Sequence, residues 1–358
     1  MKEKAIIFGV TGQDGSYLAE LLLEKGYYVV GVARRVSTSN TSRIDHLIGK
    51  EFFVLESGDV LDFSSVYNIM WKHHADEVYN LAAQSHVGVS FEQPSVTWDI
   101  TAKGCLNILE GIVKLSKTPR FYQASSSEMF GDSFSLDDNQ NAFQNESTMF
   151  NPQSPYAIAK LAAHKMTELY RKIHGLHASC GILFNHESER RGENFVTRKI
   201  SKYIASFREF LDVAMHLNIE DPNLLSNYIS SAAPKLHLGN LEACRDWGHA
   251  KDYVRAMWMM LQMEKPDTYV IATGQTHSVQ DFVEEAFKHL DIGNYASFIR
   301  IDEKQFRPSE VPYLKGDYSK AKEKLGWIPE ISFEDLVSTM VKYDIERLTN
   351  DKQPTYSV

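Results

Sequence analysis

A glycine-rich stretch, Gly9-Val10-Thr11-Gly12-Gln13-Asp14-Gly15, follows the short apolar run Ala5–Val10 and precedes an amphipathic stretch from Ser16 to about Lys25. This order is typical of a strand, a tight turn and a helix. Glycines in such a turn let the backbone approach a pyrophosphate at the helix N-terminus, where free N–H groups and the helix dipole favour negative charge. The stretch therefore predicts dinucleotide binding rather than a merely structural turn.

Short apolar runs alternate with longer amphipathic stretches up to about residue 180. Alternation of this kind indicates a parallel β-sheet with crossover helices. We therefore predict an α/β fold, a Rossmann-type doubly wound parallel sheet with a smaller mixed α/β C-terminal lobe that binds substrate. The predicted strands are Ala5–Val10, Tyr28–Ala33, Phe52–Leu55, Glu77–Ala82, Arg120–Ala124 and Ala178–Leu183.

The second half of the chain has fewer strand patterns, and helical patterns recur at Phe282–Leu290, Ser319–Leu325 and Phe333–Arg347. We expect a dinucleotide-binding domain of residues 1–184 with returning segments near 240–275. The substrate-binding lobe is expected at residues 185–239 and 276–350. Two further stretches, Asp132–Thr148 and Phe207–Pro234, look like surface elaborations whose role the residues do not indicate.

The composition argues against a nucleic-acid-binding protein, a membrane protein and a metal-binding protein. The 358 residues carry a net charge of -9, which argues against a nucleic-acid partner. No apolar run approaches the roughly 20 residues that a membrane span requires, and nothing resembles a signal peptide, so we expect no membrane partner and a cytoplasmic location. Cys105, Cys180 and Cys244 are widely spaced and lack metal-ligand spacing, which predicts reduced thiols and no metal.

The identity of the dinucleotide is indicated by Arg34 and Arg35, which follow the predicted strand Tyr28–Ala33. An NAD-specific protein usually places an acidic residue here to bind the ribose hydroxyls, whereas an arginine pair suits a 2′-phosphate. NADP is therefore preferred, and two solvated surface arginines are the alternative. The ends of the next two strands supply further candidate cofactor residues: Asp59, Val60, Leu81, Ala82, Ala83, Gln84 and Ser85.

Tyr156 and Lys160 are four residues apart, which places them on one face of a helix that begins near Pro155. Tyrosine is a poor base at its usual pKa of about 10, but a neighbouring ammonium and a positive nicotinamide ring favour the phenolate. Tyr156 can then remove a hydroxyl proton. The alternative is an ordinary helix with a snorkelling lysine, and the glycine-rich turn upstream favours catalysis.

Ser126 and Glu128 come at the end of the fifth predicted strand, at the edge where open α/β sheets assemble their sites. A simple reductase needs only the hydroxyl. The carboxylate adds a second acid or base, which can remove the proton next to a new ketone and expel water. Glu128 alone could be a structural cap, but beside Ser126 and Tyr156 we interpret it as catalytic.

With these motifs the chain resembles the GDP-mannose 4,6-dehydratase family of extended short-chain dehydrogenases, which use the Gly-x-x-Gly-x-x-Gly spacing. The most distinctive blocks are Arg245–Tyr253 and Asn185–Ser188 followed by Arg190–Glu193. The other matching blocks are Gly9–Tyr17, Arg34-Arg35, Glu77–Asn80, Gln123-Ala124-Ser125, Ser154–Lys160, Gly181–Glu187, Arg190–Lys199, Ile271–Gly274 and Phe306-Arg307-Pro308. Together they span almost the whole chain.

The resemblance implies conversion of GDP-mannose to GDP-4-keto-6-deoxymannose and water, with tightly bound NADP+ as a recycled hydride carrier. Tyr156 would deprotonate the sugar 4-hydroxyl while NADP+ takes the hydride from C4. Glu128 would act in removing the C5 proton and expelling the 6-hydroxyl, and the hydride returns to C6. Ser126 would hydrogen-bond the sugar, and Lys160 would hold the nicotinamide ribose.

The remaining implied contacts divide between cofactor and substrate. The cofactor would be bound by Gly9, Thr11, Gly12, Gln13, Asp14, Gly15, His186 and Arg191 in addition to the residues above. The GDP-sugar would be bound by Ser85, Ser126, Glu128, Tyr156, Asn185, Val196, Lys199, Arg245, Arg307 and Glu310. The resemblance also implies a homodimer or homotetramer in which the Arg35–Arg43 segment reaches a neighbouring subunit's cofactor.

Two positions depart from the family pattern. Ser126 replaces the usual threonine, which keeps the hydroxyl but loses a methyl that restrains its rotamer. Val96 stands where tyrosine is common, so one cofactor hydrogen bond is in doubt. Two alternatives stay open. One is a 4,6-dehydratase of another nucleotide sugar, because the catalytic set is indifferent to the base, and the other is a catalytically idle NADP-sensing protein of the same fold.

Overall fold

The computed structural model describes residues 2–350 except 218, 220, 291, 293, 307 and 310. These residues divide into two compact units. Unit 1 takes its residues from Met1–His186, Asp246–Thr276 and Pro308–Glu330, and unit 2 takes its residues from Glu187–Arg245, His277–Arg307 and Ile331–Val358. The segment 308–330, which we expected in the substrate-binding lobe, therefore packs in unit 1. The binding roles expected of the two domains remain predictions.

Unit 1 is built on a seven-stranded parallel sheet in the order β13-β8-β5-β4-β1-β2-β3. The order reverses between β1 and β4, as in a doubly wound sheet, and this confirms the predicted fold class. The strands are β1 (Lys4–Phe8), β2 (Tyr28–Ala33), β3 (Phe53–Ser57), β4 (Glu77–Asn80), β5 (Arg120–Ser126), β8 (Ala178–Leu183) and β13 (Thr268–Ile271).

The first six of these strands correspond to the six predicted ones, with ends that differ by up to two residues. The seventh strand, β13, was not among them. It is only four residues long and buried throughout, and a short apolar run of this kind has no alternation that separates a strand from a piece of helix or core loop.

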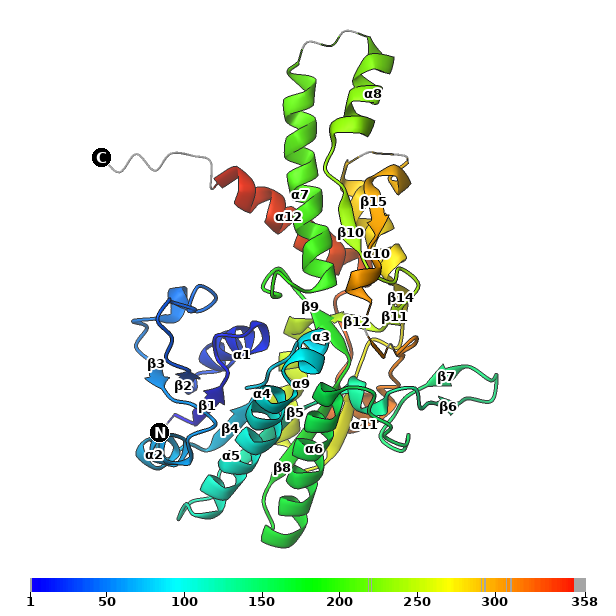
Figure 1. Cartoon of the computed structure of the whole chain (residues 1–358). Helices are drawn as coiled ribbons and strands as arrows, with labels where there is room; N and C mark the ends of the chain where they lie inside the picture. The colour runs from blue at the N-terminus through cyan, green and yellow to red at the C-terminus, as the bar shows by residue number, and fades with distance from the viewer. Residues whose placement is uncertain are drawn as a thin grey trace, which may run out of the picture. The chain divides into compact units, whose positions relative to one another are not determined.

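Two layers of helices cover the sheet (Figure 1). Successive residues of β1 point to opposite faces, so Ala5 and Ile7 join the core under one layer while Ile6 and Phe8 join the core under the other. The first layer consists of α1 (Gln13–Glu24), α9 (Ala250–Gln262) and α11 (Ser319–Leu325). The second layer consists of α2 (Phe63–His73), α5 (Gly104–Val113) and α6 (Pro155–His174).

Smaller elements complete unit 1. They are α3 (Val87–Glu92), α4 (Pro94–Trp98), β9 (Asn185–Glu187), whose last residue falls in unit 2, β12 (Trp247–His249), β6 (Ser135–Leu136) and β7 (Ala142–Phe143). The stretch Asp132–Thr148 contains the antiparallel hairpin β6–β7, which projects from the sheet (Figure 1). Its base is held by Gln144, whose backbone N–H donates to Lys315 O at 2.8 Å.

The buried carboxylate of Asp246 ties three segments of unit 1 together. It accepts the backbone N–H groups of Thr273, Gly274 and Gly316 at 2.7, 2.9 and 3.1 Å and also the Thr273 hydroxyl at 2.7 Å. A buried carboxylate is tolerated when its oxygens accept such bonds. Asp246 thereby fixes the end of β13 and holds the segment 308–330 in unit 1.

Unit 2 is mainly helical, and its core lies where α7 contacts α10 and α12. A buried ion pair, Arg198 to Asp344 at 2.7 Å, joins α7 to α12, and Ser201 Oγ donates to the same carboxylate at 2.6 Å. The elements are α7 (Val196–Met215), α8 (Pro222–Ala232), α10 (Val279–Phe287), α12 (Phe333–Asn350), the parallel pair β10 (Leu236–Leu238) and β15 (Ile299–Ile301), and the antiparallel pair β11 (Cys244–Arg245) and β14 (His277–Ser278).

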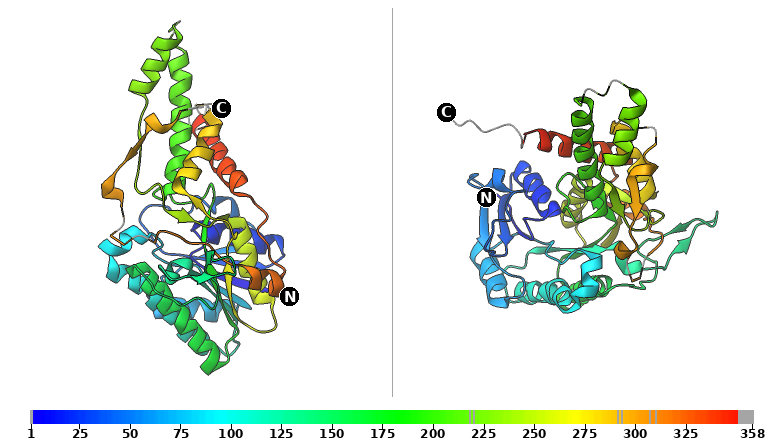
Figure 2. Two further views of the ribbon diagram at one scale, coloured as in Figure 1. Left: turned by 90° about the vertical axis from the view of Figure 1, so that its right-hand side faces the viewer. Right: turned by 45° about the horizontal axis from the view of Figure 1, so that its top comes forward.

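The helical patterns predicted for the second half of the chain are confirmed. Phe282–Leu290 falls on α10 and the 3-10 turn Lys288–Leu290. Ser319–Leu325 coincides with α11, and Phe333–Arg347 lies within α12, which ends three residues later at Asn350. The stretch Phe207–Pro234 forms the second half of α7 and the whole of α8, which run side by side in both views of Figure 2.

Candidate active site

The turn between β1 and α1 contains three glycines, and at two of them there is no room for a Cβ. Gly9 has φ +89°, and a Cβ there would lie 2.9 Å from Ala82 N. A Cβ on Gly15 would lie 2.3 Å from Gly9 O. At Gly12, by contrast, an added Cβ would meet only Gly9 O within 4 Å, at 3.3 Å. Gly12 is therefore the least crowded of the three glycines, with only Gly9 O close to the added Cβ, which fits the approach of a pyrophosphate to the backbone at the N-terminal end of α1.

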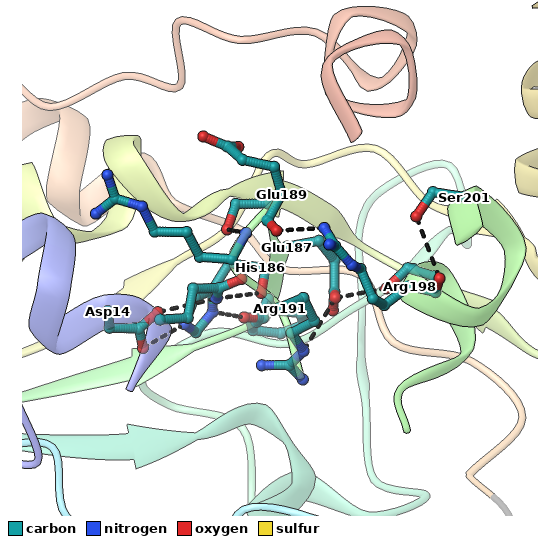
Figure 3. Close-up of polar contacts among 12 residues, drawn as sticks. Asp14, His186, Glu187, Glu189, Arg191, Arg198 and Ser201 are labelled. Carbon is teal, nitrogen blue, oxygen red and sulfur yellow. Dashed lines mark hydrogen bonds and ion pairs between the residues drawn. The ribbon is translucent and has the colours of Figure 1, made fainter. Parts of the chain in front are cut away.

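Side chains of the turn are held by a network within unit 1 (Figure 3). Asp14 Oδ2 lies 2.8 Å from His186 Nε2, and His186 Nδ1 lies 2.7 Å from Phe184 O. Gln13 Nε2 donates to Asp14 Oδ1 at 3.0 Å and to His186 O at 3.1 Å. Both ring nitrogens of His186 thus face oxygen atoms, which fixes the orientation of the ring. These predicted cofactor residues thus brace the turn through their side chains.

The arginine pair after β2 is exposed. Arg34 and Arg35 make no ion pair within the described part of the chain, so their guanidinium groups are available for an anion. Arg43 donates from Nη1 to Thr11 O of its own chain at 3.4 Å. The reach of the Arg35–Arg43 segment to a neighbouring subunit stays a prediction.

The loops after β3 and β4 use several predicted cofactor residues for their own structure. Asp59 Oδ1 accepts the Leu61 N–H at 2.9 Å, and Val60 is buried. Gln84 Oε1 accepts the His86 N–H at 2.6 Å, and Gln84 Nε2 donates to Thr97 Oγ1 at 3.0 Å. Leu81, Ala82 and Ala83 are partly buried, while Ser85 is exposed.

The four predicted catalytic side chains lie on β5, on the turn after it and on α6, which packs against β5. Ser126 is the last residue of β5, and its Oγ accepts the backbone N–H of Glu128 at 3.3 Å. Tyr156 and Lys160 belong to the first turns of α6, where Pro155 is at the first position and Ser154 Oγ caps the N–H of Ala157 at 3.1 Å. All four are between 5% and 8% exposed.

Lys160 is the charged group of this centre. Its Nζ donates to Ala124 O at 2.8 Å and lies 5.8 Å from the centre of the Tyr156 ring. Burial lowers the pKa of Lys160 to about 8, because the ammonium loses its hydration. The side chain is still mainly charged at neutral pH, and this positive charge favours ionisation of a nearby phenol. A hydroxyl, a carboxyl group, a phenol and an ammonium thus lie on β5, the turn after it and α6, and they can serve acid–base chemistry.

The predicted substrate residues divide between the two units. Asn185 lies in β9 and is partly buried. In unit 2, Val196 is the first residue of α7 and is partly buried, Lys199 Nζ donates to Gln305 Oε1 at 3.3 Å, and the buried Arg245 donates to Cys244 O at 2.9 Å. Arg307 and Glu310 lie outside the described residues.

Arg191, predicted to contact the cofactor, has partners inside unit 2 (Figure 3). It forms an ion pair with the buried Glu187 at 3.0 Å and lies over the Phe195 ring at 3.6 Å. Thr197 Oγ1 donates to the same carboxylate at 2.6 Å. Glu187 therefore neutralises Arg191 in this arrangement, and contact of Arg191 with a cofactor remains a prediction.

The sequence reasoning missed one buried polar residue next to this centre. His164 lies two turns after Tyr156 on α6, and its Nδ1 is 2.8 Å from Ser125 Oγ. The signal that would have found it is spacing, because Tyr156, Lys160, His164 and Glu168 follow one another at intervals of four. Such intervals place side chains on one helix face.

Other sequence expectations concern metals, thiols and membranes. In the part of the chain that is described, no group of three His, Cys, Asp or Glu residues could hold a metal ion. Cys105 and Cys180 are buried free thiols, and Cys244 is a partly exposed one. No helix among the described residues combines the length and the apolar character needed to cross a bilayer.

Comparison with known proteins gives a consistent result. A family model described as GDP-mannose 4,6 dehydratase matches residues 6–218 and 219–340. GDP-mannose 4,6 dehydratase 1 of Arabidopsis thaliana is 47% identical, with 97% of this chain and 91% of that protein covered. GDP-mannose 4,6-dehydratase of Vibrio cholerae is 45% identical, with 97% and 95% covered. The crystal structure of DesIV, a dTDP-glucose 4,6-dehydratase from Streptomyces venezuelae with NAD and TYD bound, aligns with a TM-score of 0.78 at 20% identity, covering 97% and 98%.

The packing of the glycine turn can be tested with Gly15→Ala. The added Cβ would meet backbone atoms of Gly9 and Val10 at 2.3 and 2.6 Å, so we expect the free energy of unfolding to fall. A loss of about 3 kcal/mol in urea denaturation is the expected size for overpacking against backbone. The control is Gly26→Ala, which meets no atom within 4 Å and carries only the strain of φ +87°. That strain costs about 1 to 2 kcal/mol. A Gly15→Ala loss no larger than the control's would contradict the described packing.

Proposed function

The chain belongs to the GDP-mannose 4,6-dehydratase family, and on that premise we propose that it converts GDP-mannose to GDP-4-keto-6-deoxymannose and water. One observation carries the proposal beyond the family match. The Tyr156–Lys160 pair, typical of a short-chain dehydrogenase, lies on α6 against β5, and a second buried acid, Glu128, lies in the turn after β5. A reductase needs only the first pair, and elimination of water needs the second group as well.

Each catalytic side chain has a proposed role at a stated atom. The Lys160 ammonium stabilises the phenolate form of Tyr156, and Tyr156 Oη then takes the proton of the sugar 4-hydroxyl and becomes a neutral phenol. Ser126 Oγ hydrogen-bonds the same sugar oxygen. The Glu128 carboxylate removes the C5 proton and then protonates the departing 6-hydroxyl. NADP, when bound, supplies a reversible hydride acceptor, so that the sugar is oxidised at C4 and reduced at C6 without net redox change.

The proton balance explains why burial of this centre is useful. The sugar gives up two protons, from the 4-hydroxyl and from C5. One leaves in the water molecule and the other returns to C5. Tyr156 and Glu128 can therefore supply the whole proton balance of a turnover between them, and both side chains are at least nine-tenths buried. Exclusion of water also strengthens the electrostatic effect of the Lys160 charge.

For the cofactor we propose NADP. The backbone at Gly12, the least crowded glycine of the turn, supports binding of a pyrophosphate at α1. The exposed Arg34 and Arg35, which form no ion pair with any described residue, support binding of a 2′-phosphate. The remaining proposed cofactor residues are Gly9, Thr11, Gln13, Asp14, Gly15, Asp59, Val60, Leu81, Ala82, Ala83, Gln84, Ser85, Lys160, His186 and Arg191. The proposed sugar-nucleotide residues are those predicted from the sequence, Arg307 and Glu310 included.

We also propose that the protein is a cytoplasmic homodimer or homotetramer. The cytoplasmic assignment is consistent with three free thiols, which suit a reducing compartment. The assembly rests on the family resemblance, and light scattering of the purified protein measures it directly.

The activity is tested by incubating purified protein with GDP-mannose and catalytic NADP+, followed by mass spectrometry and NMR of the product. We expect loss of one water, a new 4-keto, 6-methyl sugar and no accumulation of NADPH. Glu128→Gln should stop formation of the methyl group, because the amide cannot take the C5 proton. Turnover of dTDP-glucose or a UDP-sugar instead of GDP-mannose would assign another substrate. Binding of NADP with no turnover of any of these sugars would favour the sensor alternative.

The cofactor assignment is tested by replacing Arg34 and Arg35 with alanine. Loss of two charge-assisted contacts to the 2′-phosphate should weaken NADP+ binding by about 30- to 1,000-fold, because each is worth roughly 1 to 2 kcal/mol, while NAD+ binding stays unchanged. Fluorescence titration with both dinucleotides measures this. Lys50→Ala, at an exposed lysine after the same segment, is the control. Equal loss of NAD+ and NADP+ affinity would contradict the assigned role.

The charge on Lys160 predicts an alkaline limit to activity. Because its pKa is lowered to about 8, kcat/KM should fall as the pH rises through about 8 and the ammonium is lost. Lys160→Arg keeps its charge to far higher pH, so the limb should move upward even though the rate is lower. The measurement is a pH profile of both proteins from neutral pH to about 10. If the alkaline fall in kcat/KM occurs at the same pH in the arginine variant, the titrating group is not Lys160.

A further inference from the structure

A series of three polar side chains in contact lies beside the proposed catalytic residues and includes none of them. Ser125 Oγ lies 2.8 Å from His164 Nδ1, and His164 Nε2 lies 3.3 Å from Glu168 Oε1. Ser125 is 3% exposed and His164 is 1% exposed, whereas Glu168 reaches the surface of α6. These side-chain contacts therefore extend from strand β5 across one face of α6 to solvent.

The same face of α6 is linked to β5 at two consecutive residues. Lys160 Nζ donates to the carbonyl of Ala124, and His164 contacts the side chain of Ser125. The next residue of β5 is Ser126, and the turn that follows holds Glu128. The distance between the end of β5 and the helix that carries Tyr156 is thus set by two side-chain links, of which Lys160 supplies one.

Electrostatics favour a charged His164 in spite of its burial. Burial lowers the pKa of the imidazole, but Cys180 on β8 and Glu168 outweigh this and raise it to about 9. The hydrogen bond from His164 is the main reason why the pKa of Glu168 falls to about 2, and Lys165 Nζ, 2.8 Å from the same carboxylate, adds to it. His164 also contacts an uncharged neighbour, the Phe150 ring, which meets the imidazole edge-on with the ring centres 5.4 Å apart.

An ion pair with a buried imidazole and a partly exposed carboxylate is weak evidence for stability, because apolar side chains of similar volume often replace a buried charge at no loss. Here the imidazolium can donate from Nδ1 to Ser125 Oγ while Nε2 donates to Glu168. Each of the two bonds has a defined direction and length, which restrains the ring and the strand together.

We propose that His164 is a positioning residue of the dehydratase centre, which links Ser125 to Glu168 and so holds the end of β5, with Ser126 and Glu128, at the correct place relative to Tyr156. It acts through Ser125 and touches neither sugar nor cofactor. The inference rests on the proposed function. A displacement of about 1 Å at a reacting group can lower a rate by about 100-fold, so removal of the link should act on kcat rather than on binding.

The test compares four variants of the full-length protein in the GDP-mannose assay. His164→Phe removes both bonds and keeps an aromatic ring, and Ser125→Ala removes only the partner hydroxyl. His164→Gln offers a smaller polar side chain that can bond Ser125. The matched control is His174→Phe, at an exposed histidine near the end of the same helix. For each protein the measurements are kcat, KM for GDP-mannose and the thermal midpoint.

We expect His164→Phe and Ser125→Ala to lower kcat by about 10-fold or more, with KM changed by less than about 2-fold. His164→Gln should recover part of the loss, and the control should match the unmodified protein. The double variant Ser125→Ala/His164→Phe should lose no more than the larger single loss, because both changes break one link. A purely structural role would lower the thermal midpoint while leaving kcat per folded molecule unchanged.

Two results would overturn the inference while leaving the proposed function in place. One is a kcat within about 2-fold of the unmodified protein in both single variants, and the other is multiplication of the two losses in the double variant. If the unmodified protein itself does not turn over GDP-mannose, the proposed function and this role fail together. NMR of the His164 ring nitrogens then still decides the link, because Ser125→Ala should shift Nδ1 and leave Nε2 in place.

Discussion

The close approach of the β1–α1 turn to the end of β4 constrains the rest of unit 1. A Cβ on Gly9 would meet the backbone of Leu81 and Ala82 at 2.9 Å, so these two central strands can lie this close only with glycine there. They are also the strands between which the sheet order reverses. The chain leaves them toward opposite faces, which opens the crevice where doubly wound sheets bind ligands. The strand order also places β5 next to β4, and α6 packs against β5.

Within unit 1, the proposed catalytic side chains all lie where α6 packs against the end of β5. β5 supplies a hydroxyl at its end and a carboxylate in the following turn, while α6 supplies a phenol and an ammonium from adjacent helical turns. The helix is well delimited, with Ser154 capping its start and Gly175 ending it at φ +64°. A capped helix of defined register keeps residues four apart on the sheet side, and so local sequence determines which side chains meet β5.

Much of this could be predicted from the sequence because the signals are local. The bounds of β2 and β8 and the start of α6 follow from apolar runs, a proline and a capping serine. What escaped depends on residues distant in the chain. β13 becomes a strand by pairing with β8, and the segment 308–330 joins unit 1 through Asp246 and Gln144. His164 is recognisable only once Ser125 is known to face it. The side chains of Gln13 and Gln84 likewise have partners that no spacing reveals.

The interleaving of the two units has a consequence for synthesis. Unit 1 takes in β13 only after residues 187–245 of unit 2 have been made, and the segment 308–330 only after residues 277–307 of unit 2 have followed. Until residues 268–271 emerge from the ribosome, β8 is an unpaired edge of an apolar parallel sheet, and such edges invite association with other chains. Burial of that edge therefore comes late, and the edge stays exposed over a longer stretch of translation than in a domain made from one continuous segment.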